Sequence, residues 1–249
     1  MNQKSNQPAM RRLLTKVAAA AGFTAIVVAG MLITSSRSSA KNDNNAEQDE
    51  KLKIRIGMQV NPVLPLNLAG KDPDMVYLGS YIVNVTGDCN GCHSNGPSTE
   101  FIGNPALFAP PSHTVHQVKQ INPATFLGGG RDFGPFPAPT SPLHIYSRNL
   151  TPDSTGMAEG GHSYSDFVQI MRTGIDFDGV HPTCPTTTQT STCVPYPFDG
   201  SLLQIMRWPS FQDMTDRELR AIYEYLSAVP CIDTVVANQP QLRNTCPVK

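Results

Sequence analysis

The spacing of apolar residues predicts a first helix over about residues 74–85, with Asp72 or Asp74 as its N-cap. The apolar positions recur every three or four residues, at Met75, Leu78, Ile82 and Val85. Gly79 lies in the middle of this helix, where glycine costs about 1 kcal/mol relative to alanine. We therefore expect another element to approach the helix closely at Gly79. The alternative is a glycine that the helix simply tolerates.

Capping signals predict two further helices. Residues 163–166, Ser-Tyr-Ser-Asp, resemble a capping box, and the helix that they begin should end at Gly174. Residues 215–218, Thr-Asp-Arg-Glu, form a strict capping box, and the helix that follows should end before Pro230. Both helices carry apolar residues along one face.

The remaining pattern predicts little regular structure. Residues 34–53 are polar and without apolar periodicity, which is typical of a disordered tether. Residues 53–60 alternate apolar and polar positions, so we expect a short extended segment there. The stretch between the first and second helices is rich in Gly and Pro, including residues 128–130, and such a stretch usually wraps a ligand or is disordered. The expected fold class is mainly α, with long Gly/Pro-rich loops.

Charge and the N-terminal apolar run indicate export. Residues 1–40 hold five basic residues and no acidic one, so the rest of the chain carries 14 basic against 20 acidic residues. An acidic body offers no basic surface for phosphates, which argues against nucleic-acid binding. The basic head, the apolar residues 17–33 and the small residues 38–40 form an export signal with cleavage after Ala40. At 17 residues the run also reaches the lower limit for a membrane span, so an uncleaved anchor is the alternative. Both place the body in the periplasm or at the outer cell surface.

The motif Cys89-Asn90-Gly91-Cys92-His93 carries the strongest chemical signal. Two thiols at this spacing can add to the two vinyl groups of a haem, and His93 would then bind the iron as the proximal ligand. A thioredoxin-like redox pair requires a preceding strand in a βαβ unit. A zinc site requires two more ligands at similar spacing. The sequence offers neither. The sequence predicts one covalent haem c at Cys89 and Cys92, with a structural disulfide as the remaining alternative.

These residues resemble the class I cytochromes c, in particular the cytochrome modules of periplasmic dehydrogenases that act on alcohols, sugars and sugar acids. The resemblance spans about residues 72–230 and rests on the haem motif together with residues 79–83, 148–153, 167–174 and 206–211. It implies a cytochrome c-like helical fold around one covalent haem. Two features depart from that family: its dehydrogenase subunits usually carry three haem motifs where this chain has one, and Arg207 stands where proline is common.

A methionine sulfur is the expected sixth ligand of the iron, because a thioether raises the reduction potential. Met171 lies on a predicted helical face, Met214 can pack against Leu219 at the start of the third helix, and Met157 lies in a Gly-rich loop. Met206 lies in an apolar loop shortly before the third helix, where the resembled family places its ligand. We predict Met206 as the distal iron ligand, with a histidine as its rival.

Other polar residues receive ordinary interpretations. Five histidines besides His93 are expected to be surface or hydrogen-bonded residues: His113, His116, His144, His162 and His181. Arg148 could pair with a haem propionate or remain a solvated charge. Trp208 could donate to a propionate or be a buried structural side chain.

The remaining four cysteines predict two disulfides. Outside the cytoplasm an even number of cysteines suggests disulfides, and four cysteines allow three pairings. The local pairs, Cys184–Cys193 and Cys231–Cys246, are our prediction, since each closes a short loop. A metal or redox site built from all four is the alternative, which the lack of short ligand spacing disfavours.

The expected organisation has four parts: a signal peptide or N-terminal membrane anchor over 1–40, a polar tether and short extended segment over 41–70, a monohaem cytochrome c domain over 71–231, and a disulfide-fastened tail over 232–249.

The expected function is that of a one-electron carrier, not an enzyme, between a dehydrogenase donor and a cytochrome or oxidase acceptor. Two alternatives remain. One is a haem subunit permanently docked on a dehydrogenase, and the other is a five-coordinate haem sensor or enzyme.

Overall fold

A computed structural model describes residues 45–61, 64–102, 120–233 and 245–247. The chain divides into two units, Met1–Lys51 and Leu52–Lys249, and the contacts reported below lie within the second. The expected signal peptide or anchor over residues 1–40 lies outside the described residues. Within the described ranges, none of the helices combines the length and the apolar character needed to cross a membrane.

Residues 45–60 form a helix, so the extended segment expected over residues 53–60 is wrong, and so is the disordered tether where it overlaps this helix, over residues 45–53. The apolar residues there also fit a helical period, because Ile54, Gly57 and Val60 are at least partly buried while Leu52 and Met58 are about half exposed. The preceding residues are mostly strong helix formers such as Ala, Glu, Gln and Lys. An apolar run this short fits both the helical period and the alternating period of a strand. The helix-forming residues before it decide in favour of the helix.

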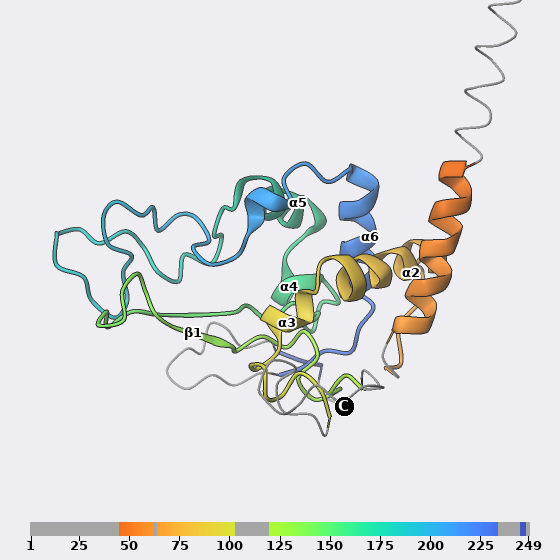
Figure 1. Ribbon diagram of the computed structural model, residues 1–249, viewed down its shortest axis with the longest axis horizontal. Helices are drawn as coiled ribbons and strands as arrows, with labels where there is room; N and C mark the ends of the chain where they lie inside the picture. Colours follow the sequence, from red (N-terminus) through yellow and green to blue (C-terminus); the bar gives the residue numbers. More distant parts are fainter. Residues whose placement is uncertain (1–44, 62–63, 103–119, 234–244, 248–249) are drawn as a thin grey trace, which may run out of the picture. The chain divides into compact units, whose positions relative to one another are not determined.

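The core is organised around the crossing of α2 (Pro73–Tyr81) and α6 (Asp216–Leu226), which pack against each other (Figure 1). A Cβ atom at Gly79 would lie 2.0 Å from the carbonyl oxygen of Ala221, well inside van der Waals contact. The close approach expected at Gly79 is therefore confirmed. Around this crossing lie fully buried side chains: Val76, Val83, Leu219, Tyr225 and Leu226.

The first predicted helix continues beyond α2 as a π-helix, η1 (Ile82–Thr86), which leads into α3 (Cys89–His93). The side-chain amide of Asn84 donates to the carbonyl oxygen of Ser80 at 2.9 Å. The wider π turn rotates the last residues away from the α-helical face. For that reason Val85, which we placed on the apolar face, is 45% exposed.

Both predicted capping boxes are confirmed. Ser163 and Asp166 cap α5 (Tyr164–Thr173), and Thr215 and Glu218 cap α6. Helix α5 ends at Gly174, whose φ of 73° is the left-handed conformation that favours glycine.

The segments between these helices are mostly irregular. Strand β1 (Asp132–Pro135) pairs antiparallel with β2 (His144–Tyr146), and two short helical turns follow, α4 (Ala158–Gly161) and the 3-10 helix η2 (Trp208–Ser210). The structure forms both expected disulfides, Cys184–Cys193 and Cys231–Cys246. The chain after α6 is also held by Ile232, whose N–H donates to Thr151 Oγ1 at 3.0 Å.

Candidate functional site

A mostly apolar cavity of about 580 Å³ lies within the second unit. Its volume falls in the range of about 300–1,000 Å³ that is usual for small-molecule and cofactor sites. Cys89, Cys92, His93 and Met206 all line it. The structure thus brings together the four residues that the sequence selected, although they are spread over more than a hundred positions of the chain.

His93 is held in one orientation by the backbone. Its Nδ1 atom lies 2.7 Å from the carbonyl oxygen of Arg148. Because a carbonyl oxygen only accepts hydrogen bonds, Nδ1 carries the proton and Nε2 keeps its lone pair. Burial lowers the pKa of His93. The hydrogen bond to the Arg148 carbonyl oxygen opposes this shift and the positive charge of Arg148 adds to it; the net shift is downward, so the ring is neutral near pH 7. A neutral imidazole with a fixed Nε2 lone pair is a metal ligand.

The glycine-rich stretch makes this arrangement possible. Gly129 has a φ of 72°, and a Cβ atom there would lie 2.5 Å from the carbonyl carbon and oxygen of Arg148. The N–H of Gly129 donates to the carbonyl oxygen of His93 at 2.6 Å. On the other side, Asn90 Oδ1 accepts the N–H of Leu127 at 2.8 Å. These contacts fasten α3 to the loop that precedes β1.

The segment over residues 148–153, which carries part of the family resemblance, positions the Arg148 carbonyl. Asn149 Oδ1 accepts hydrogen bonds from the N–H of Thr151 at 2.9 Å and from its hydroxyl at 2.7 Å. The N–H of Leu150 donates to Leu127 at 2.9 Å, and the Leu150 side chain is buried at the cavity wall. Polar residues of this segment thus fix a local turn, and its apolar residue faces inward.

Cys89 and Cys92 are free thiols at the cavity wall. Burial raises the pKa of Cys89 to about 12, and the neighbouring negative charge of Asp88 adds to the shift. Cys89 is therefore a protonated thiol at neutral pH. The structural disulfide that the sequence left open at Cys89 and Cys92 is absent from this part of the described structure.

The loop that carries Met206 is fastened to the end of α5. The N–H of Leu203 donates to the carbonyl oxygen of Gly174 at 2.7 Å, and the indole of Trp208 packs directly over Gly174. Trp208 therefore has a packing role in this loop. Met171 and Met214 also line the cavity, so the cavity wall alone does not single out one methionine.

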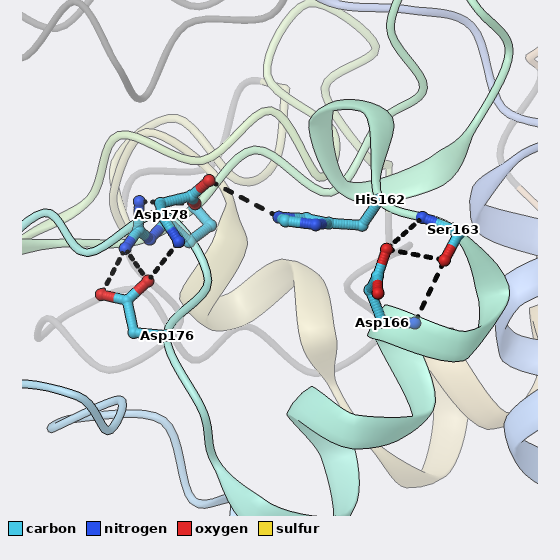
Figure 2. A network of polar contacts seen from close by, with 6 residues as sticks. His162, Ser163, Asp166, Asp176 and Asp178 are labelled. Carbon is cyan, nitrogen blue, oxygen red and sulfur yellow. Dashed lines mark hydrogen bonds and ion pairs between the residues drawn. The ribbon is translucent and has the colours of Figure 1, made fainter.

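Arg148 lies among carboxylates on the polar side of the cavity. Its Nη2 atom is 2.7 Å and 2.8 Å from the two carboxylate oxygens of Asp176, and its Nη1 atom is 2.8 Å from Asp178. Asp178 also lies 3.6 Å from His162 Nε2, and this interaction raises the pKa of His162 (Figure 2). The guanidinium proposed for a propionate thus already pairs with two carboxylates of the chain.

Among the titratable residues of the cavity wall, sequence reasoning did not mark Glu159, and it gave His181 only an ordinary surface or hydrogen-bonded role. Burial lowers the pKa of His181, so a neutral imidazole other than His93 also lies at the cavity. Glu159 belongs to α4, a single turn with no apolar period, and no motif in the sequence marks it. His144 is half-buried and pairs with Asp132 at 2.8 Å, whereas His113 and His116 lie outside the described residues.

No protein-family model, curated protein or solved structure matches this chain. The chemistry of the site is therefore judged from its own groups. Two free thiols, a neutral imidazole with a fixed lone pair and thioether sulfurs face one mostly apolar cavity. This set of donors fits a covalently attached haem.

Proposed function

We propose that this chain is a monohaem c-type cytochrome that carries single electrons outside the cytoplasm. The observation that carries the proposal is the convergence of Cys89, Cys92, His93 and Met206 on one cavity, with Nδ1 of His93 held by the Arg148 carbonyl oxygen. When bound there, haem would supply one-electron oxidation and reduction at its iron. The cytochrome c-like fold expected from the sequence belongs to the same proposal.

Each residue has a defined task in this proposal. The thiols of Cys89 and Cys92 would each add S–H across one vinyl group, which needs no oxidant. His93 would bind the iron through Nε2 while Arg148 holds Nδ1 with its carbonyl oxygen. Met206 would provide the distal sulfur, and the apolar wall would exclude water and thereby raise the potential.

The disulfides support the proposed compartment, and the resemblance to dehydrogenase cytochrome modules suggests the partners. The disulfides Cys184–Cys193 and Cys231–Cys246 are typical of oxidising compartments. Export through the N-terminal segment, as a cleaved signal or as an anchor, would bring the chain there. We propose a dehydrogenase as the electron donor and a cytochrome or an oxidase as the acceptor.

The test is covalent attachment. The full chain is exported in a bacterium that attaches haem to c-type cytochromes, and the purified protein is extracted with acidified organic solvent. Haem should remain on the polypeptide, and Cys89→Ala and Cys92→Ala should each greatly reduce the attached haem. The double variant Cys184→Ala/Cys193→Ala is the matched control and should keep it. Complete extraction of haem from the wild type would overturn the proposal.

Carbon monoxide separates the carrier from the sensor or enzyme. A reduced protein with both axial positions filled should not bind carbon monoxide at neutral pH. Ready binding by the wild type would favour a haem with an open distal position, and the electron-carrier function would then fail even if the haem is covalent.

A further inference from the structure

Glu159 is a half-buried carboxyl residue that has no role in the proposed haem ligation. It lies on α4 and lines the cavity. Its Oε2 atom is buried and makes no hydrogen bond with any residue that the structure describes. The backbone holds it there, because its N–H donates to Leu150 at 3.1 Å and its φ of 52° is rare for a residue other than glycine.

The charged groups around Glu159 already pair with one another. Arg148 and His162 lower the pKa of Glu159, whereas Asp176 and Asp178 raise it. Arg148 pairs with both aspartates, and Asp178 also pairs with His162 (Figure 2). An ionised Glu159 would thus be an uncompensated negative charge at a mostly apolar wall, which is costly.

Other titratable groups also lie near this cluster, among them Asp153, whose carboxylate lies against α4 at Gly161. Asp166 on α5 acts on His162, although its own carboxylate is occupied by the capping box at Ser163. His181 lies on the cavity wall, and the hydroxyl of Tyr223 on α6 donates to the carbonyl oxygen of His162. Among these groups, Glu159 combines a place on the cavity wall with a buried oxygen that lacks a partner.

We propose that Glu159 is a proton-binding site coupled to the redox state of the cavity. It takes up one proton from solvent when a one-electron donor reduces the bound haem, and it releases that proton when an acceptor oxidises the haem. Electron uptake at the haem and proton uptake at Glu159 are thus coupled. This inference rests on the proposed function, since it requires haem in the cavity.

The sign of the coupling follows from charge. The ferric site carries one more positive charge than the ferrous site, so an ionised Glu159 stabilises the ferric form. Reduction removes that positive charge and makes proton binding easier. Burial raises the pKa of Glu159 to about 7, which places the coupling near neutral pH. The reduction potential should therefore fall as the pH rises through this range.

The experiment measures the midpoint potential of the covalently loaded protein from about pH 6 to pH 8. A fully coupled proton changes the equilibrium constant for reduction tenfold per pH unit, which is about 59 mV for one electron. We expect the wild-type constant to fall at least about threefold across the range. Glu159→Gln should remove most of this dependence. Asp213→Asn, which removes an exposed carboxylate, should behave like the wild type.

Two further measurements keep the test decisive if Glu159→Gln fails to acquire covalent haem. Chemical reduction of the wild type in unbuffered solution near pH 7 should take up protons, which an indicator dye reports. His162→Gln should move the pH-dependent range upward, because the charge of His162 lowers the pKa of Glu159.

Three outcomes would overturn the proposal: a covalent haem whose potential is constant with pH, a pH dependence that Glu159→Gln leaves intact, or a range that His162→Gln does not raise. The second outcome would assign the proton to another group, such as a haem propionate or His181. Loss of the haem itself on extraction would instead contradict the proposed function, so the two failures are distinguishable.

Discussion

The α2–α6 crossing and the cavity wall between β2 and η2 are held together in different ways. At the crossing, two regular helices meet through buried apolar side chains, with Gly79 at the point of closest approach. Outside α5, this part of the cavity wall has little regular structure, and it is fixed by single hydrogen bonds such as those from His93 to Arg148 and from Leu203 to Gly174. The crossing should therefore govern global stability. The wall should govern the chemistry of the site.

The largest effect on stability is expected from Gly79→Ala. The added Cβ atom would lie 2.0 Å from the Ala221 carbonyl oxygen and 2.7 Å from Tyr225 Cβ, so the helices must separate. We expect the free energy of unfolding to fall by more than about 3 kcal/mol, measured by denaturant titration. Gly70→Ala is the control, because nothing lies within 4 Å of its Cβ position and only its φ of 72° opposes the change. Equal losses in both variants would contradict a steric origin.

Removing either disulfide should lower the free energy of unfolding slightly less than Gly79→Ala does. The two disulfides should differ in their effect on the site. In the chain-entropy description, Cys231–Cys246 contributes about 3 kcal/mol and the shorter loop of Cys184–Cys193 about 2.5 kcal/mol. Paired Cys→Ala variants measure each contribution by denaturant titration. Because Cys184–Cys193 closes a loop of the irregular region before Met206, its loss should also increase carbon monoxide binding. If the loss of Cys231–Cys246 increased carbon monoxide binding and the loss of Cys184–Cys193 did not, the chain after α6 would control access to the site.

Gly129→Ala should affect the site more than the fold. The new Cβ atom would press on the Arg148 carbonyl group that holds His93, and the φ of 72° adds strain. We expect a stability loss of about 2 kcal/mol together with a clear drop in the fraction of chains that carry covalent haem. Gly134→Ala is the matched control, since it has a similar φ of 79° but no atom within 4 Å of its Cβ position. An unchanged haem content in Gly129→Ala would show that α3 does not depend on this contact.

The difference between the two regions also explains what the sequence could predict. Helical periodicity and capping boxes are local signals, so α5, α6 and the close approach at Gly79 could be inferred from residues near in sequence. The helix over residues 45–60 was missed because its short apolar run fits two periods.

At the site, the five-residue motif marks Cys89, Cys92 and His93 through spacing alone. Glu159 and the Arg148 carbonyl reach the cavity through loop contacts between distant segments, and no local pattern encodes such contacts. The sequence thus identified groups that carry chemistry by themselves. Groups that act through their surroundings became visible only in the fold.

The smallest stability changes, and the sharpest spectral ones, are expected among the residues that compete for the distal position. Met171→Leu and Met214→Leu should each cost at most about 1.5 kcal/mol, because leucine nearly matches methionine in volume. Both should keep the wild-type spectrum, as should His181→Ala, whereas Met206→Ala should lose the ferric thioether band and bind carbon monoxide after reduction. All four variants line the same cavity, so the comparison isolates the ligand from the general effect of altering the wall. If Met206→Ala kept the band and Met171→Leu or Met214→Leu lost it, the sulfur would come from a helix or its cap. The irregular wall would then not supply the distal ligand, and the division of roles between the two regions would fail there.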